Sequence, residues 1–182
     1  KNPTFENRFE LLGFTAKNYD TTGILREIML GIAFGVIGIF LVAGASFLIQ
    51  VLIEYFTGIR IIQESSGTPT NDAEILISGA DLISLILMVA VMFLVVGTSE
   101  EILFRGFMQK GLVRTLGKTW GILVTAFIFA IIHLISLALL VIMYNPFEIF
   151  IIFIYLFVPY FAISLLLGGL YYWRGENLIA VM

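Results

Sequence analysis

The chain has 182 residues, of which 60% are hydrophobic and 13% charged, and a formal net charge of −3. Its mean hydropathy is +1.05, whereas an ordinary soluble domain has about 45–50% apolar and about 25% charged residues. The composition therefore excludes a soluble globule and predicts an integral membrane protein, and the acidic balance lacks the clustered basic face of a nucleic-acid-binding protein.

The first predicted span runs from Ile28 to Ile53, 26 residues without a charge. About 20 apolar residues suffice for a helix to cross the hydrocarbon core of a bilayer. This span carries four glycines that are either a helix-packing face of small residues or ordinary membrane-helix content: Gly31, Gly35, Gly38 and Gly44. Residues 54–81 are polar and rich in turn-forming residues, which predicts an exposed loop.

The second predicted span covers Leu82 to Ser99, 18 residues without a charge, and we expect its helix to continue toward Lys110. The third predicted span covers Trp120 to Phe147 and contains the only histidine of the chain, His133. We expect Asn145-Pro146 to mark the end of that third span as a turn.

The fourth predicted span covers Ile149 to Trp173, and Asn177 to Met182 reads as the opening of a fifth. The sequence therefore predicts an all-α fold, a polytopic transmembrane helical bundle that forms a single membrane-embedded domain over residues 1–182. The chain lacks an initiator Met and ends within an apolar segment. We accordingly expect a piece of a longer polypeptide, truncated within a later span.

The distribution of basic residues predicts the orientation of these spans. If the N-terminus is cytoplasmic, nine of the ten Lys and Arg residues lie on the cytoplasmic side and only Arg60 lies outside. This asymmetry is what the positive-inside rule describes. It predicts that the polar end of the second span, with Glu100 and Glu101, lies toward the cytoplasmic face.

The adjacent carboxylates of Glu100 and Glu101 follow directly on an apolar span. Ionisable groups at membrane depth are costly unless they are paired or hydrated, and they usually serve a function. On a helix Glu101 and Arg105 share a face, while Glu100 is rotated by about 100°. We expect an ion pair between Glu101 and Arg105, with Glu100 left to polarise a water. A purely structural pair, with Arg105 as a juxtamembrane anchor, is the alternative.

His133 lies four residues after Phe129, on the same helical face. With Glu100 it supplies a base and a second group that handles protons or stabilises an oxyanion, a combination suited to hydrolysis by an activated water. The helical rise places Glu100 about 15 Å and His133 about 21 Å from the inner membrane boundary. The sequence alone therefore leaves open whether the two side chains meet.

Other chemistries fit the residues less well. Cysteine is absent and the predicted spans contain no aspartate, which removes thiol and aspartic mechanisms. Ser99 with His133 as its base lacks the G-x-S-x-G signature. A metal held by Glu100, Glu101 and His133 lacks the spacing of zinc proteases. A proton-coupled transporter would place Glu and His in spans as a relay, but it predicts inverted repeats.

Taken together, Glu100-Glu101-x-x-x-Arg105 and Phe129-x-x-x-His133 resemble the first two motifs of the type II CAAX prenyl endopeptidases, the Ras-converting-enzyme type. The wider intramembrane family includes bacteriocin-processing relatives. The 33-residue spacing from Glu100 to His133 is similar to that of an archaeal member. The resemblance covers the chain from about Leu82 to Met182.

The resemblance implies an intramembrane glutamate endopeptidase that cuts after a prenylated cysteine and releases the last three residues. We expect no cofactor, and we favour a metal-independent reaction over a metal-dependent one. The resemblance implies that Glu100 activates the water, that His133 binds water or stabilises the oxyanion, and that Glu101, Arg105 and Phe129 support the site.

The implied partners are a prenylated C-terminal CAAX peptide and membrane lipid, in the plasma membrane of a prokaryote or the endoplasmic reticulum of a eukaryote. The family's third motif, His-x-x-x-Asn, is expected beyond Met182. A non-catalytic scaffold of the same family is the alternative, and that third motif would distinguish the two.

Overall fold

The computed structural model of the protein describes residues 21–59, 82–135 and 145–182, and every regular element among them is helical. The N-terminal helix is α2 (Thr21–Thr57). A composite helix then runs through α4 (Leu82–Val91), η1 (Met92–Gly97), α5 (Thr98–Glu101), η2 (Ile102–Gln109) and α6 (Lys110–Leu116), and is followed by α7 (Lys118–His133) and α8 (Pro146–Trp173). The predicted all-α fold is confirmed.

Three helices among the described residues are long and apolar enough to cross a membrane: Thr22–Thr57, Leu82–Leu116 and Pro146–Trp173. Their outer surfaces carry large exposed hydrophobic side chains, such as Phe40 on α2 and Leu82 on α4. A soluble monomer does not expose apolar surface on this scale. The helices therefore belong to an integral membrane protein.

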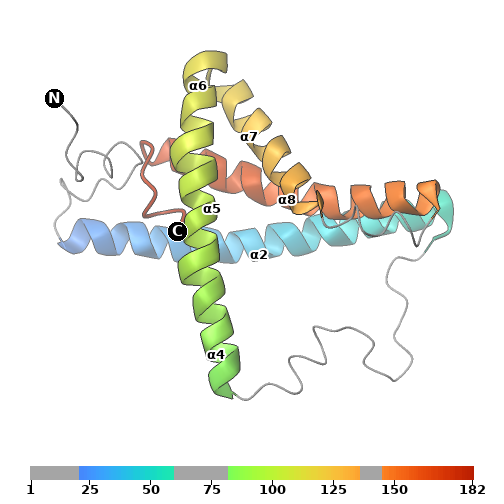
Figure 1. Cartoon of the computed structure of the whole chain (residues 1–182), viewed down its shortest axis with the longest axis horizontal. Helices are drawn as coiled ribbons and strands as arrows, with labels where there is room; N and C mark the ends of the chain where they lie inside the picture. The colour runs from blue at the N-terminus through green and yellow to red at the C-terminus, as the bar shows by residue number, and fades with distance from the viewer. Residues whose placement is uncertain (1–20, 60–81, 136–144) are drawn as a thin grey trace.

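Helix α8 packs against both α2 and α7, and these two pairs organise the structure (Figure 1). α2 and α8 lie side by side and run in opposite directions, and the composite helix passes across them. α7 turns back from the top of α6 and descends against α8. The turn is made at Gly117, whose φ of +82° is readily adopted only by glycine. This arrangement brings the middle of the composite helix, the end of α7 and the middle of α8 together.

The predicted third span, Trp120 to Phe147, is wrong at its C-terminal end. α7 ends at His133, and residues 136–144 lie outside the described part of the chain. Asn145-Pro146 starts α8 and does not end α7: the Asn145 side chain accepts a hydrogen bond from the Glu148 N–H, and the Glu148 carboxylate accepts one from the Asn145 N–H. This reciprocal capping box, with Pro at the first helical position, is a helix start.

The predicted opening of a fifth span at Asn177 to Met182 stays a prediction, since these residues form bends and turns in which the Met182 N–H donates to the Leu178 carbonyl. Gly175 and Glu176 both have positive φ, which ends α8, and the Asn177 side chain accepts a hydrogen bond from the Ile179 N–H. Leu178 is fully buried. It joins a small core cluster with residues 170, 171 and 181, so the segment packs back on the bundle.

A buried ion pair fastens α2 to the end of α8. The Arg174 guanidinium donates two hydrogen bonds to the carboxylate of Glu27, one from Nε to Oε2 at 3.1 Å and one from Nη2 to Oε1. Glu27 is fully buried. Such a two-pronged pair fixes both distance and orientation, so it sets how the start of α2 sits against α8.

The glycines of α2 divide into two kinds. A β-carbon added at Gly31 would lie 2.9 Å from the Ala180 carbonyl oxygen, and one at Gly38 would lie 2.7 Å from Ile163 Cδ1. At Gly35 and Gly44 nothing lies within 4 Å. The packing interpretation is therefore confirmed for Gly31 and Gly38, where another segment of the same chain approaches closely. It is wrong for Gly35 and Gly44.

Gly31→Ala is expected to lower the thermal unfolding midpoint in detergent, because the new methyl group meets backbone that cannot rotate away; overpacking of this kind costs about 1–3 kcal/mol. Gly35→Ala is the matched control on the same helix, and it should leave the midpoint unchanged or raise it. Equal effects of the two substitutions would contradict this assignment of the packing face.

Glu27→Ala is expected to destabilise the protein strongly, since it leaves the largely buried Arg174 guanidinium without its partner. Breaking a buried ion pair from one side typically costs about 3–5 kcal/mol. Arg26→Ala removes a charge from the neighbouring exposed position and should change the thermal midpoint little. If the thermal midpoint of Glu27→Ala is as high as that of Arg26→Ala, the Glu27–Arg174 ion pair does not hold α2 against α8.

Candidate active site

The two carboxylates occupy a single α-helical turn, α5, between two π-helical stretches. In π-helix the hydrogen bonds run from residue i to i+5, and such stretches are frequent at functional sites. The wider turn brings residues four apart closer to eclipsing than in α-helix. Glu101, Arg105 and Gln109 therefore form a polar row along one side of the composite helix, and all three are buried.

The structure contains the predicted ion pair between Glu101 and Arg105, with Nη1 3.1 Å from Oε1. Arg105 is completely buried. Its guanidinium carbon lies 4.9 Å from the centre of the Phe129 ring on α7, which is the geometry of a cation–π contact. The arginine therefore links the composite helix to α7.

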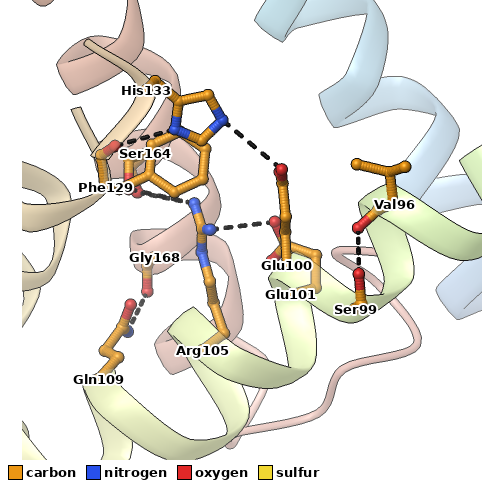
Figure 2. A network of polar contacts seen from close by, with 10 residues as sticks. All are labelled: Val96, Ser99, Glu100, Glu101, Arg105, Gln109, Phe129, His133, Ser164 and Gly168. Atoms are coloured by element: carbon orange, nitrogen blue, oxygen red, sulfur yellow. Dashed lines mark hydrogen bonds and ion pairs between the residues drawn. The ribbon is translucent and has the colours of Figure 1, made fainter. Parts of the chain in front are cut away.

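Arg105 also reaches α8. Its Nη2 donates a hydrogen bond to Ser164 Oγ at 3.2 Å and lies 3.5 Å from the Ser164 carbonyl oxygen. Figure 2 shows the guanidinium between Glu101 on one side and Ser164 on the other. One buried cation thus contacts three helical segments.

Glu100 points away from this pair and toward His133 (Figure 2). Its Oε1 lies 3.6 Å from His133 Nε2, and the two side chains are 35% and 23% exposed. The expected difference in depth does not separate them, because α7 descends at a slant from α6 (Figure 1). The structure therefore brings together the carboxylate and the imidazole that the sequence analysis singled out.

The other ring nitrogen of His133 fixes its tautomer. Nδ1 lies 2.9 Å from the Phe129 carbonyl oxygen, one turn back on α7. A carbonyl oxygen only accepts hydrogen bonds, so Nδ1 carries the proton and Nε2 of the neutral ring is an acceptor. In the neutral ring the nitrogen that faces Glu100 is therefore the one able to accept a hydrogen bond, and in the protonated ring the same nitrogen donates to the carboxylate.

Two aromatic rings pack against the imidazole. The His133 ring centre lies 4.1 Å from that of Phe129 and 4.8 Å from that of Tyr160 on α8, with interplanar angles of 32° and 31°. Phe104 packs edge-on against Phe129 at 4.8 Å. Phe129 thus supports both parts of the site, since its ring also faces Arg105.

Beyond the site, the polar row continues to a second contact with α8. Gln109 Nε2 donates a hydrogen bond to the Gly168 carbonyl oxygen at 2.8 Å. A β-carbon at Gly168 would lie 2.6 Å from Gln109 Oε1, so the glycine makes room for the amide. This contact docks the composite helix on α8 without touching the Glu101–Arg105 pair.

Two other proposed arrangements are not assembled. The Ser99 hydroxyl donates a hydrogen bond to the Val96 carbonyl oxygen on its own helix and points away from His133 (Figure 2). Among the described residues, no three His, Cys, Asp or Glu side chains converge as potential metal ligands. Glu101 turns toward Arg105, which separates it from the other two candidates.

Sequence reasoning missed the two α8 residues at the site, Tyr160 and Ser164. They are four residues apart and therefore lie on one helical face. A signal was present, since polar side chains within an apolar span generally face the bundle interior. It could not say which distant residues they contact: Arg105 and Ser164 are separated by 59 positions.

The model of one protein family, described as type II CAAX prenyl endopeptidase Rce1-like, matches residues 82–182. This segment includes every side chain of the site. The chain belongs to the Rce1-like family. Comparisons with curated proteins and with solved structures found no match. The predicted resemblance is thus confirmed, and the protein is an integral membrane member of a family of CAAX proteases.

Arg105→Lys is expected to lower the free energy of unfolding by about 1.5–3 kcal/mol, the usual loss for a hydrogen bond to a charged group. An ammonium cannot face Glu101, Ser164 and the Phe129 ring at once as the planar guanidinium does. Arg114→Lys makes the same change at an exposed position on α6 and should have little effect in the same thermal unfolding assay. Equal midpoints for both variants would contradict the bridging role.

Proposed function

We propose that this protein is an intramembrane glutamate endopeptidase that hydrolyses the peptide bond after a prenylated cysteine and releases the C-terminal tripeptide of a CAAX sequence. The observation that carries the proposal is the approach of Glu100 to the acceptor nitrogen of His133, while the second carboxylate is held by Arg105. Membership in the Rce1-like family supports the substrate class.

In the proposed reaction Glu100 acts as the general base. It takes one proton from a water molecule as the water oxygen adds to the scissile carbonyl carbon, and His133 Nε2 accepts a hydrogen bond from the remaining hydrogen. The resulting tetrahedral intermediate collapses when the carbon–nitrogen bond breaks. Glu100 then returns the proton to the leaving amine and is regenerated as a carboxylate.

Glu101 has a different role in this proposal, although it is the neighbour of Glu100. Its carboxylate is buried and paired, so it is not available to a substrate. With Arg105 and Phe129 it forms a rigid support that keeps the turn carrying Glu100 in place. Rigid support of this kind is what precise orientation of a catalytic group requires.

The surroundings of the pair fit a reaction that needs both water and lipid. Glu100 and His133 are about one-third and one-quarter exposed, while the adjoining helix surfaces are apolar. The basic residues of the chain favour an active site toward the cytoplasmic face, in the plasma membrane or the endoplasmic reticulum. A prenylated peptide would enter with its lipid chain in the bilayer.

The test is cleavage of a fluorescent farnesylated CAAX peptide by the full-length protein in detergent. Glu100→Gln is expected to lower kcat/KM by about 10²–10⁴-fold, the usual contribution of a positioned general base, and His133→Ala should also impair cleavage. Glu54→Gln, the same substitution near the end of α2, is the matched control and should cleave at the wild-type rate.

Four results would count against the proposal. Full activity of Glu100→Gln would exclude its role as base, inactivation by a chelator would indicate a metal mechanism, and equal cleavage of an unprenylated peptide would remove the prenyl requirement. A folded wild-type protein that cleaves no CAAX peptide would point to the non-catalytic family member.

A further inference from the structure

One face of α8 contacts both halves of the site. Tyr160 packs against the His133 ring, and one turn later Ser164 accepts the hydrogen bond from Arg105. One turn further, the Gly168 carbonyl accepts the hydrogen bond from Gln109. Residues at this spacing lie in a row along a helix. In this row Tyr160 contacts α7, and Ser164 and Gly168 contact the composite helix.

Ser164 occupies the central place in this row. Its side chain is 2% exposed, and within the described part of the chain both hydrogen bonds of the Arg105 guanidinium go to it, one to Oγ and one to its carbonyl. The ion pair to Glu101 lies within one helix and cannot by itself fix the rotation of that helix. The bond to Ser164 comes from another helix and restrains this rotation one helical turn closer to Glu100 than the Gln109 bond does.

The rotation of the composite helix matters because Glu100 adjoins Glu101 in the same turn of α5. If that turn rotates about the helix axis, Glu100 swings along the surface of α7 and leaves His133. The distance between Glu100 and His133 therefore depends on what Arg105 is anchored to.

We propose that Ser164 is a positioning residue: by holding Arg105 from α8, it sets the rotation of the helix that carries Glu100, so that Glu100 faces His133. This inference rests on the proposed function for the catalytic role of that pair. Ser164 itself does not touch the reacting atoms.

Gln109 offers a matched comparison. It lies on the same helix as Arg105, is also buried, and also donates to α8, at 2.8 Å to the Gly168 carbonyl. It belongs to neither the ion pair nor the contacts of His133. Loss of the Gln109 bond should weaken helix docking in general, whereas loss of the Ser164 bond should also misplace Glu100.

The experiment compares Ser164→Val with Ser164→Thr in the farnesylated peptide assay. The two variants have the same shape and differ only in the hydroxyl. We expect Ser164→Val to lower kcat about tenfold or more, because a buried hydrogen bond to a charged group is lost, with KM unchanged. Ser164→Thr should restore most of kcat, and Gln109→Leu should lower the thermal midpoint while kcat stays near wild type.

Two results would overturn the inference while leaving the proposed function intact. One is that the wild type cleaves the peptide and that Ser164→Val and Ser164→Thr have the same kcat as the wild type. The other is a loss of kcat in Gln109→Leu as large as in Ser164→Val, which would assign the effect to helix docking as a whole.

A second measurement tests the anchor without relying on activity. A double-mutant cycle on thermal unfolding, with Ser164→Ala, Arg105→Gln and the combination, measures the coupling between the two residues. We expect the effect of Ser164→Ala to disappear in the Arg105→Gln background. If the wild type cleaves no CAAX peptide, the proposed function fails, but the cycle still tests whether Ser164 anchors Arg105. Coupling between the two substitutions would support this anchor, and additive effects would overturn it.

Discussion

The burial of one positive charge, the guanidinium of Arg105, constrains the arrangement around the site. A buried cation is tolerated only when its charge is paired and its donors find partners. Here the charge is paired with Glu101 on the same helix and faces the Phe129 ring on α7, and Nη2 donates to Ser164 on α8, while Nε finds no hydrogen-bond partner among the described residues. If any of the three segments shifts, Arg105 loses one of these contacts while its charge stays buried. The positions of Glu100 and His133 follow from this requirement. Glu100 adjoins Glu101 in sequence, and His133 packs on the Phe129 ring, and Arg105 contacts both Glu101 and Phe129.

The sequence predicted the local part of this arrangement well. The spacing of Glu101 and Arg105 leads directly to their ion pair, and the rotation of Glu100 away from it follows from helix geometry. The long-range part could not be predicted. The contact with Ser164 spans 59 residues, and the approach of Glu100 to His133 depends on the slant of α7, which no local pattern encodes. The catalytic roles of these residues stay predictions.

The error in the predicted end of the third span has a physical cause. In a soluble helix the alternation of polar and apolar residues marks where one element stops, but from Trp120 to Trp173 nearly every residue is apolar and this signal is absent. Asn145-Pro146 was then the clearest turn signal near the end of the third span, and this dipeptide is compatible with the end of one helix or the start of the next. The capping box with Glu148 decides for a start. Its acidic residue three positions after the Asn was the available clue.

The two π-helical stretches beside α5 also bear on which length changes this helix can accommodate. Inserting or deleting one residue in an uninterrupted α-helix turns every later side chain by about 100° relative to the earlier ones. A π turn differs from an α turn by one residue within its hydrogen-bonded ring. η1 and η2 therefore provide places on either side of the acidic pair where the chain can gain or lose a residue by converting π to α or the reverse. Length changes in the membrane-facing half of the helix would then be absorbed at Met92–Gly97, and the turn that carries Glu100 would keep its orientation.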